Sequence, residues 1–490
     1  MLARKILPFG LPLLAFLALA FAFFPESIDD AYITLRYSLN LALGHGPIFN
    51  IGERVEGYSN PVWMALLALT GKIGLSMPLM MKVYSVIAGA VAILIVGQYA
   101  DRVFGRIAAL SAMALLACST FFALWATDGL ETMFYTALVT GLYILLLSSA
   151  NPVTIGIVAS LVALTRPEGA IFGLVACSYL AWRRGYKQSL AVLALLAIFG
   201  GAYELFRIEY FGALVPNTAL AKVHTTAQTV LRGGQYLWRF NAESGYLVLP
   251  AVVVSIWIHR KNDTVLLGAA FMGAQLVFLA VSGGDFMYGY RFVVPVLPII
   301  ALLASGCLSG DLLTDSNVRG WMAVLGVAVV VAFQYASLPP MRVRVDNLVA
   351  RRSTHFDVAR YLVSRTTVAD TVVLSEAGIV PFGIRARVYD YLGLTSPYHS
   401  VFTADGHVSA ENALLDQPKF VLLTMKEGHA GALVPRTNVD ADLFDTLPLS
   451  SRYKAVRQFY IDPNLSYLDK IYYKYAPDAV RIYFVVYERI

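Results

Sequence analysis

Long apolar runs separated by short polar turns dominate the first two thirds of this chain. Each run is close to the roughly 20 residues that an α-helix needs to cross a bilayer. The pattern predicts about eleven membrane spans, at residues 6–24, 81–100, 107–126, 131–149, 153–165, 168–182, 189–208, 244–258, 264–281, 293–309 and 319–338. Residues 61–77 are also apolar, but Gly71, Lys72 and Gly74 interrupt them, so we expect a helix that lies at the outer surface.

The pattern changes after Pro339 and Pro340. Short β-branched or aromatic runs at 371–374, 420–423 and 482–487 are typical of strands. Helix-like segments at 354–364 and 408–415 accompany them. The chain is therefore expected to be an α-helical polytopic membrane protein, with a transmembrane domain at residues 1–338 and a soluble extracytoplasmic α/β domain at residues 339–490.

Composition excludes an ordinary soluble protein, because 58% of the residues are hydrophobic and only 14% are charged. The net charge of +6 is spread over loops without a dense basic block, which gives no indication of nucleic-acid binding. The three cysteines, Cys118, Cys177 and Cys307, lie far apart inside apolar runs and lack the spacing of a metal site.

Basic residues also predict the orientation of the spans. Arg4 and Lys5 precede the first apolar run, which could alternatively be a cleaved signal peptide. With the N-terminus in the cytoplasm, the short basic turns near 102–106, 183–187 and 259–261 fall on the cytoplasmic side, as the positive-inside rule expects. The C-terminal domain would then lie outside.

Two adjacent carboxylates, Asp29 and Asp30, stand in the first outer loop and open a helix-like segment. They are compatible with an ordinary helix start, in which Ser27 or Asp29 is the N-cap and both carboxylates favour the helix dipole. They are equally compatible with catalysis, because transfer of a group to a hydroxyl needs a base that takes the proton of that hydroxyl. The second carboxylate would orient the base or hold a divalent cation; no other cofactor is indicated.

Four further polar segments fall on the same side in this topology: residues 128–131, 165–169, 215–222 and 283–292. Arg166 and Glu168 interrupt an apolar run, where charges need partners or a ligand. Lys222 and Arg291 are of the type that binds phosphate, although Lys222 could be a solvated cation and Arg291 could simply pair with Asp285. The convergence of these segments favours a binding site for a lipid phosphate.

Read together, the segments resemble the terminal β-(1→2)-arabinofuranosyltransferases, which act on mycobacterial-type cell-wall arabinan. Residues 29–37 carry the most specific part, followed by 44–46, 49–50, 53–61, 129–132, 165–169, 216–218 with Lys222, and 284–285 with 291–292. The resemblance covers most of residues 25–300. It implies the GT-C fold, a catalytic aspartate in the first outer loop, a polyprenyl-phosphate sugar donor and inversion of the anomeric centre.

Carried over residue by residue, the resemblance implies that Asp29 is the base and Asp30 its partner, and that Arg166, Lys222 and Arg291 bind the phosphate. The other expected substrate-binding residues are Arg36, Glu53, Glu56, Tyr58, Asn60, Glu131, Glu168, Asn217 and Asp285. The expected reaction moves a sugar, arabinofuranose, onto a cell-envelope glycan or glycoprotein outside the cytoplasmic membrane of a bacterium. The chain is shorter than the arabinan enzymes, chiefly in its C-terminal domain.

Two alternatives remain open. A mannosyl- or aminoarabinosyl-transferase of the same fold would carry the same segments. A transporter or flippase for lipid-linked sugars would have charged residues at mid-span, paired broken helices and repeat symmetry between its halves. The sequence shows no internal repeat.

Overall fold

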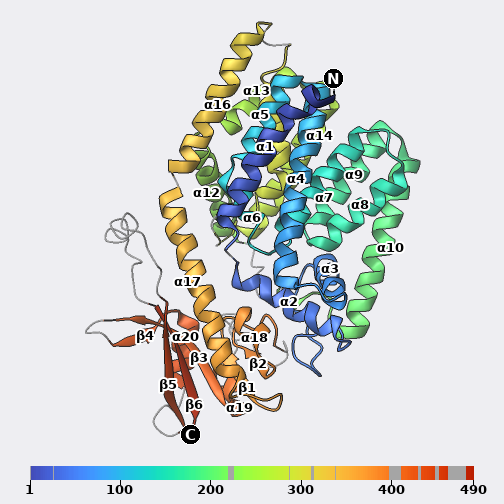
Figure 1. Ribbon diagram of the computed structural model, residues 1–490. Coiled ribbons are helices and arrows are strands. Elements are labelled where there is room, and N and C mark those ends of the chain that lie inside the picture. The colour runs from blue at the N-terminus through green and yellow to red at the C-terminus, as the bar shows by residue number, and fades with distance from the viewer. Residues whose placement is uncertain are drawn as a thin grey trace. The chain divides into compact units, whose positions relative to one another are not determined.

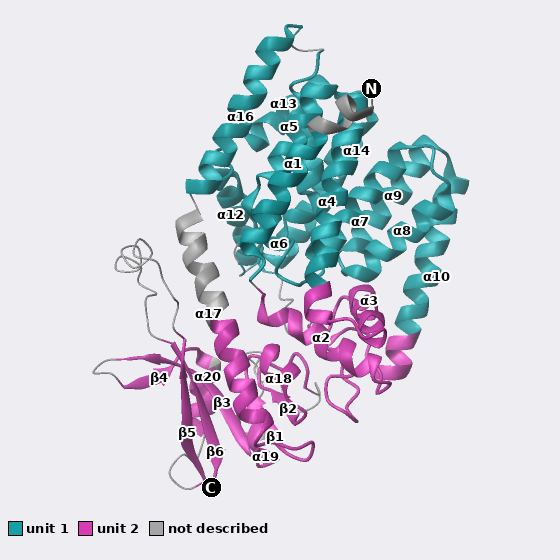
Figure 2. Cartoon of the chain, viewed as in Figure 1, with its two compact units in different colours: residues 1–25, 81–205, 223–341 teal, residues 26–80, 206–222, 342–490 magenta. Residues whose placement is uncertain are grey.

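The computed structural model of this chain describes residues 2–25, 27–218, 226–285, 287, 289–310, 314–336, 338–396, 410–428, 432–446, 452–461 and 482–490. Figure 1 shows its helices and strands. The chain packs into two compact units, coloured in Figure 2. Unit 1 comprises residues 1–25, 81–205 and 223–341, and unit 2 comprises residues 26–80, 206–222 and 342–490.

Unit 1 is built from apolar helices. They are α1 (Leu2–Phe23), α4 (Met77–Val103), α5 (Arg106–Ala117), α6 (Thr120–Trp125), α7 (Thr132–Leu147), α8 (Pro152–Thr165), α9 (Gly169–Arg183), α10 (Tyr186–Phe211), α12 (Ala227–Glu243), α13 (Val248–Ile258), α14 (Asp263–Ser282), the 3₁₀ turn η1 (Val294–Val296), α15 (Leu297–Gly306) and α16 (Ser316–Ala336). In the described part, α4, α10, α14 and α16 are long and apolar enough to cross a bilayer, and the bent pair α12–α13 makes a fifth candidate. The chain is thus a multi-pass membrane protein, and the count of eleven spans stays a prediction.

The predicted spans fall on these helices with two differences. The run 107–126 is divided into α5 and α6, because Ser119 accepts a hydrogen bond from the amide of Phe122 and caps a new helix. The region between the predicted spans 189–208 and 244–258 contains α12, an amphipathic helix whose polar face gives it too low a mean hydropathy to be predicted as a span. The predicted break at Pro167 is confirmed, since α8 ends at Thr165 and α9 begins at Gly169.

Unit 2 contains a mixed sheet of six strands: β1 (Thr371–Leu374), β2 (Arg387–Asp390), β3 (Phe420–Glu427), β4 (Leu433–Pro435), β5 (Tyr453–Tyr460) and β6 (Ile482–Arg489). The strand order is β2-β1-β3-β6-β5, with β4 beside β3. β1 is parallel to β2 and β3, and β6 is antiparallel to β3 and β5. The three predicted strand runs are therefore confirmed as parts of β1, β3 and β6.

Helices cover both faces of this sheet. One face packs against α19 (Ala410–Leu415) and α20 (Asn438–Thr446), where Ala413 and Leu443 meet side chains such as Val421 and Val485. On the other face, His355 of α17 (Leu338–Val363) lies against Phe484 of β6, with ring centroids 4.5 Å apart. Phe484 and Val485 are neighbours on β6 and point to opposite faces, because side chains alternate between the two faces along a strand.

The first loop belongs to the same compact unit as the sheet. Its helix α2 (Asp29–Ala42) buries residues 31–38 and packs against α3 (Pro61–Lys72) and α18 (Ile379–Gly383). Helix α3, in the region expected to lie at the surface, has 12 residues. At about 1.5 Å per residue it is shorter than the roughly 30 Å of a bilayer core.

Candidate functional site

Asp29 is the first residue of α2. Its carboxylate is held by backbone amides of residues 342–490, the part of unit 2 called here the C-terminal segment. Oδ2 accepts a hydrogen bond from the amide of Gly378 at 2.9 Å, and Oδ1 accepts one from the amide of Ile379 at 2.8 Å. A Cβ at position 378 would overlap the backbone carbonyl of Asp29, so only glycine allows this approach. Both carboxylate oxygens are therefore oriented by residues that lie about 350 positions away in the chain.

His355 and Glu376 stand beside this carboxylate. One atom of each of the three side chains lies within 4.8 Å of the others. His355 is buried, with 2% of the residue exposed. Its Nε2 atom shares a hydrogen bond with one oxygen of Glu376, and Arg351 donates a hydrogen bond to the other oxygen. The four side chains form what is called here the Asp29 cluster.

The cluster sets the ionisation of its members. Burial raises the pKa of Asp29 to about 6, with His355 opposing and Glu376 reinforcing the shift. Burial would also raise the pKa of Glu376, but Arg351 and His355 hold that pKa down at about 2. Burial alone would lower the pKa of His355, yet Glu376 and Asp29 raise it. The cluster thus holds the pKa of Glu376 low and raises the pKa of His355, next to Asp29, whose pKa is raised to about 6.

Asp30 occupies the next position of α2 and is half-buried. Within the described ranges, no hydrogen bond or ion pair involves its carboxylate. The predicted pair thus contains one carboxylate held by backbone amides and one without a hydrogen bond or ion pair to the described residues.

A divalent cation bound near Asp29 would share its carboxylate ligands with hydrogen-bond donors of the protein. Among the described residues, Asp29, His355 and Glu376 form the group whose spacing could suit a metal ion, and Asp30 is not a member of it. Both oxygens of Asp29 already accept amide hydrogens, and Glu376 is paired with Arg351. These bonds orient the carboxylates and leave each oxygen of Asp29 one further lone pair, so a divalent cation stays a prediction made from the sequence.

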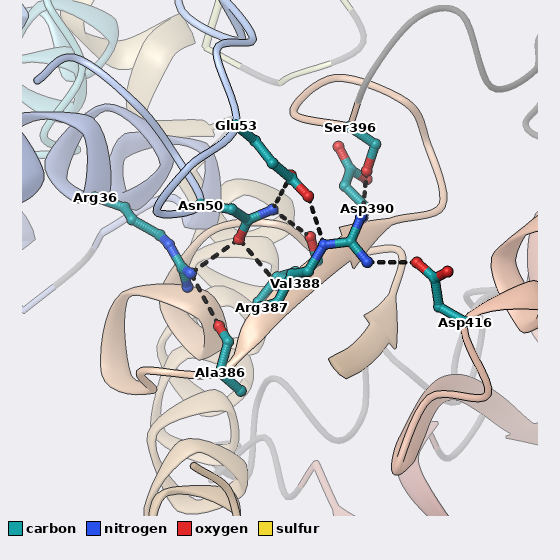
Figure 3. A network of polar contacts seen from close by, with 9 residues as sticks. All are labelled: Arg36, Asn50, Glu53, Ala386, Arg387, Val388, Asp390, Ser396 and Asp416. Carbon is teal, nitrogen blue, oxygen red and sulfur yellow. Dashed lines mark hydrogen bonds and ion pairs between the residues drawn. The ribbon is translucent and has the colours of Figure 1, made fainter. Parts of the chain in front are cut away.

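Other residues of the first loop bind it to the C-terminal segment (Figure 3). The guanidinium of Arg36 donates to Phe49 O at 2.7 Å, to Asn50 Oδ1 and Ala386 O at 3.1 Å each, and to Pro381 O. These acceptors are all protein atoms, which gives Arg36 a structural role; its role toward substrate stays a prediction.

Glu53 and Asn50 extend this network to strand β2. Glu53 forms an ion pair with Arg387 at 2.5 Å and accepts a hydrogen bond from Asn50 at 2.8 Å. Asn50 also donates to the carbonyl of Val388 and accepts from its amide. The strand therefore holds the loop through both backbone and side-chain bonds.

The remaining predicted residues of unit 2 are Glu56, Tyr58 and Asn60 of the first loop and Asn217 of the segment after α10. Glu56 is buried and pairs with Arg207 at 2.6 Å, and its carbonyl accepts the amide of Asn217 at 3.0 Å. The side chain of Asn217 donates to the carbonyl of Ser396 at 2.8 Å. Tyr58 packs edge-on against Tyr37, and Asn60 bonds the hydroxyl of Thr34. These contacts shape the loop.

A second polar cluster lies in unit 1, where three predicted segments meet. Arg166 forms ion pairs with Glu131 at 2.6 Å and with Glu168 at 2.5 Å. Arg291 pairs with Asp285 at 2.6 Å. The Cζ atoms of the two arginines lie 5.4 and 4.9 Å from the centroid of the Phe292 ring, so one aromatic ring contacts both cations. These residues are called here the arginine cluster.

Each arginine keeps donors for a ligand. Arg166 donates Nε–H and Nη1–H to its two carboxylates, whereas Nε of Arg291 lies 2.6 Å from Asp285 Oδ2 without the geometry of a hydrogen bond. Among the residues that the structure describes, no hydrogen bond involves Nη2 of Arg166 or either Nη atom of Arg291. Both arginine side chains are only slightly exposed, at 11% and 13%.

The list of candidate residues missed two charged side chains in unit 1. Asp128 is 1% exposed, and its Oδ2 atom is buried without a hydrogen-bond partner in the described part of the chain. Lys82 is buried and donates to the carbonyl of Phe24 at 2.6 Å. A charged residue inside an apolar run was the available signal for Lys82. The predicted phosphate binder Lys222 lies outside the described residues.

Comparisons with known proteins place this geometry in context. A family model described as "Domain of unknown function (DUF8728)" matches residues 344–483. Over 327 residues, the chain is 33% identical to a terminal β-(1→2)-arabinofuranosyltransferase of Mycobacterium tuberculosis, which covers 56% of this chain and 51% of the relative. A protein of the same name from Corynebacterium glutamicum is 26% identical over 350 residues, which is 62% of this chain and 50% of that protein. The chain spans about half the length of the curated relatives it matches.

The fold is similar to that of ArnT from Cupriavidus metallidurans. Its apo structure gives a TM-score of 0.60 at 16% identity, over 99% of this chain and 98% of that chain. The structure of ArnT bound to undecaprenyl phosphate gives 0.59 at 15% identity with the same coverage. The two curated relatives confirm the sequence resemblance to terminal β-(1→2)-arabinofuranosyltransferases. The similarity to ArnT confirms the GT-C fold.

Proposed function

We propose that this chain is a glycosyltransferase that moves a sugar, arabinofuranose, from a polyprenyl-phosphate donor to a hydroxyl group of a cell-envelope glycan or glycoprotein. The observation that carries the proposal is the oriented carboxylate of Asp29, within the stretch that resembles arabinofuranosyltransferases most specifically. The names of the curated relatives support the sugar, and the fold shared with an undecaprenyl phosphate-bound ArnT supports the lipid phosphate.

In the proposed reaction, Asp29 is the general base. With a pKa of about 6 the carboxylate is ionised at neutral pH and still basic enough to take the acceptor proton. The acceptor oxygen forms a bond to the anomeric carbon while the bond from that carbon to the phosphate oxygen breaks. The electron pair leaves with the lipid phosphate, the proton goes to Asp29, and the anomeric centre is inverted.

Asp30 and the first-loop residues take supporting roles in this proposal. The half-buried carboxylate of Asp30 is available for a hydroxyl of the acceptor or for a cation. Glu53, Glu56, Tyr58, Asn60 and Asn217 contribute to the substrate site, in part through the loop that their mutual contacts hold together.

The arginine cluster is proposed to bind the donor. The unused Nη atoms of Arg166 and Arg291 can donate to phosphate oxygens, which guanidinium groups bind well. Glu131, Glu168 and Asp285 orient these guanidinium groups and can accept hydrogen bonds from sugar hydroxyls. Lys222 is included on the sequence alone.

The proposed location is the cytoplasmic membrane of a bacterium, with the N-terminus inside and the C-terminal residues outside. The basic turns at 102–106, 183–187 and 259–261 support this orientation. Cysteine labelling of the turn at 183–187 in intact and in permeabilised cells tests it. Labelling in intact cells would reverse the assignment.

The activity is tested with the purified protein in lipid nanodiscs. Labelled decaprenyl-phosphoryl arabinose is the donor, decaprenyl-phosphoryl mannose is the control donor, and an oligo-arabinoside is the acceptor. Arabinose transfer with no mannose transfer supports the reaction and the sugar. Mannose transfer alone would replace the sugar but keep the reaction class, and absence of any transfer would remove arabinan as the acceptor.

A further inference from the structure

We propose that the C-terminal segment is part of the catalytic centre, and that His355 and Glu376 are positioning residues for the carboxylate of Asp29. The inference rests on the proposed function, because it concerns the base of that reaction. It gives a role to residues 375–378, which the sequence marks only as the end of a strand.

The first step is the set of hydrogen bonds that joins helix α2 to α18 and the residues beside it. Asp29 and Arg36 lie on one helix, two turns apart, and both bond to the short helix α18 and the residues beside it. Asp29 accepts the amides of Gly378 and Ile379 at the start of α18, while Arg36 donates to the carbonyls of Pro381 and Ala386. The orientation of the Asp29 carboxylate therefore depends on where α18 lies.

The second step is what holds the residues beside Asp29 in place. Glu376 lies two residues before Gly378 and is bound by Arg351 and His355 of α17. The ring of His355 is buried against Phe484 of the central sheet. These contacts connect the turn at 376–379 to α17 and to the sheet, so the sheet supports the position of the base.

The third step is the balance of charge. Asp30 on its own helix, His355 on α17 and Glu376 at the end of β1 act on the charge of Asp29, and Arg351 and Arg436 act in turn on Glu376. Two carboxylates so close together would repel each other, and Arg351 and His355, which lower the pKa of Glu376, offset that repulsion.

A purely structural role of His355 and Glu376 can be separated from a positioning role by experiment, because the sheet has a second packed face. The sheet has its own apolar core on the opposite face, around Val373, Val421, Leu423 and Val485. A substitution that weakens that core should lower stability without affecting the base. This difference separates a positioning role from a structural role by experiment.

The test compares the full-length protein with the variants His355→Gln, Glu376→Gln and Gly378→Ala in nanodiscs. Gly378→Ala places a Cβ against the Asp29 carbonyl and so displaces the two amides. Tyr453→Phe is the matched control, because it removes one buried hydrogen bond, to the carbonyl of Pro418 at 2.7 Å, elsewhere on the sheet. Unfolding temperature, kcat and the KM for donor and for acceptor are measured for each.

We expect kcat to fall at least tenfold in the three variants, with the donor KM unchanged. The fall should not exceed the roughly 10²- to 10⁴-fold that a general base supplies. Tyr453→Phe should lower the unfolding temperature and keep kcat. The inference is overturned if folded variants of His355 and Glu376 keep the kcat of the native protein while that protein transfers sugar. That result would leave the proposed function intact.

A second measurement does not depend on turnover. Unfolding of the native protein, Asp29→Asn, His355→Gln and the double variant forms a double-mutant cycle. Non-additive changes in unfolding temperature support the coupling between Asp29 and His355, and additive changes overturn it. If the native protein transfers no sugar from any donor, the proposed function fails and this cycle still decides the positioning of Asp29.

Discussion

Arg36 and Pro381 are 345 positions apart in the sequence, yet the guanidinium of Arg36 donates a hydrogen bond to the carbonyl oxygen of Pro381. Arg36 is buried and also bonds Phe49, Asn50 and Ala386. It thereby joins the loop that carries Asp29 to the segment that orients Asp29.

Replacement of Arg36 should therefore destabilise the protein. Arg36→Lys keeps the charge but cannot reach several acceptors with one planar group, which leaves buried carbonyls without donors. We expect a loss of roughly 2–4 kcal/mol in unfolding free energy, from the hydrogen bonds and the unpaired acceptors. Differential scanning fluorimetry in detergent measures it, with the exposed Arg360→Lys as control. An unchanged unfolding temperature would contradict the role of Arg36.

Asp29→Asn should remove the base while keeping its shape. We expect kcat to fall by about 10²- to 10⁴-fold, the contribution of a general base. Asp357→Asn, which changes an exposed ion pair with Arg360, is the matched control and should keep full activity. Near-normal turnover of the Asp29→Asn protein would show that another group takes the acceptor proton.

The pH dependence of transfer should reflect the titration of Asp29. The base must be ionised, and its pKa is about 6, so kcat/KM should rise as the pH increases through about 6 and then level off. His355 lowers the pKa of Asp29 against the effect of burial. His355→Gln removes that charge, so the acid limb should move to higher pH. A limb that stays in place in this variant would exclude electrostatic coupling between the two groups.

Variants of the arginine cluster should affect the donor. Arg166→Gln and Arg291→Gln each remove guanidinium donors and leave carboxylates without their partners. We expect the donor KM to rise at least about tenfold, the effect of losing one charge-assisted contact of 1.5–3 kcal/mol, while the acceptor KM stays constant. Arg106→Gln, which breaks a half-exposed pair with Asp101 in the same unit, is the control. An unchanged donor KM would remove these arginines from the donor site.

Part of the candidate site could be predicted from the sequence because its chemistry is local. Arg166 and Glu168 interrupt an apolar run, where charges need partners, and Asp285 lies in a polar segment between two apolar runs. The structure brings them together with Glu131 and Arg291 in one cluster. Asp128 belongs to the predicted polar segment 128–131, but the sequence did not mark it as a candidate site residue.

The other part could not be predicted, because its signal is spread over distant segments. Nothing beside His355 in the sequence distinguishes it from an ordinary histidine on a helix. Gly378 resembles any glycine after a strand, and its need for a missing Cβ arises only because the backbone of Asp29 approaches it.

The sequence by itself determined the apolar helices, the break at Pro167, the strands β1, β3 and β6, and the segments that resemble arabinofuranosyltransferases. These features follow from hydrophobic periodicity and backbone propensity, which act over a few residues. Only the tertiary structure decided that the C-terminal segment holds Asp29 and Arg36. Those bonds join groups hundreds of residues apart, and hydrogen bonds of that kind exist only when packing has brought the backbone of α18 against α2.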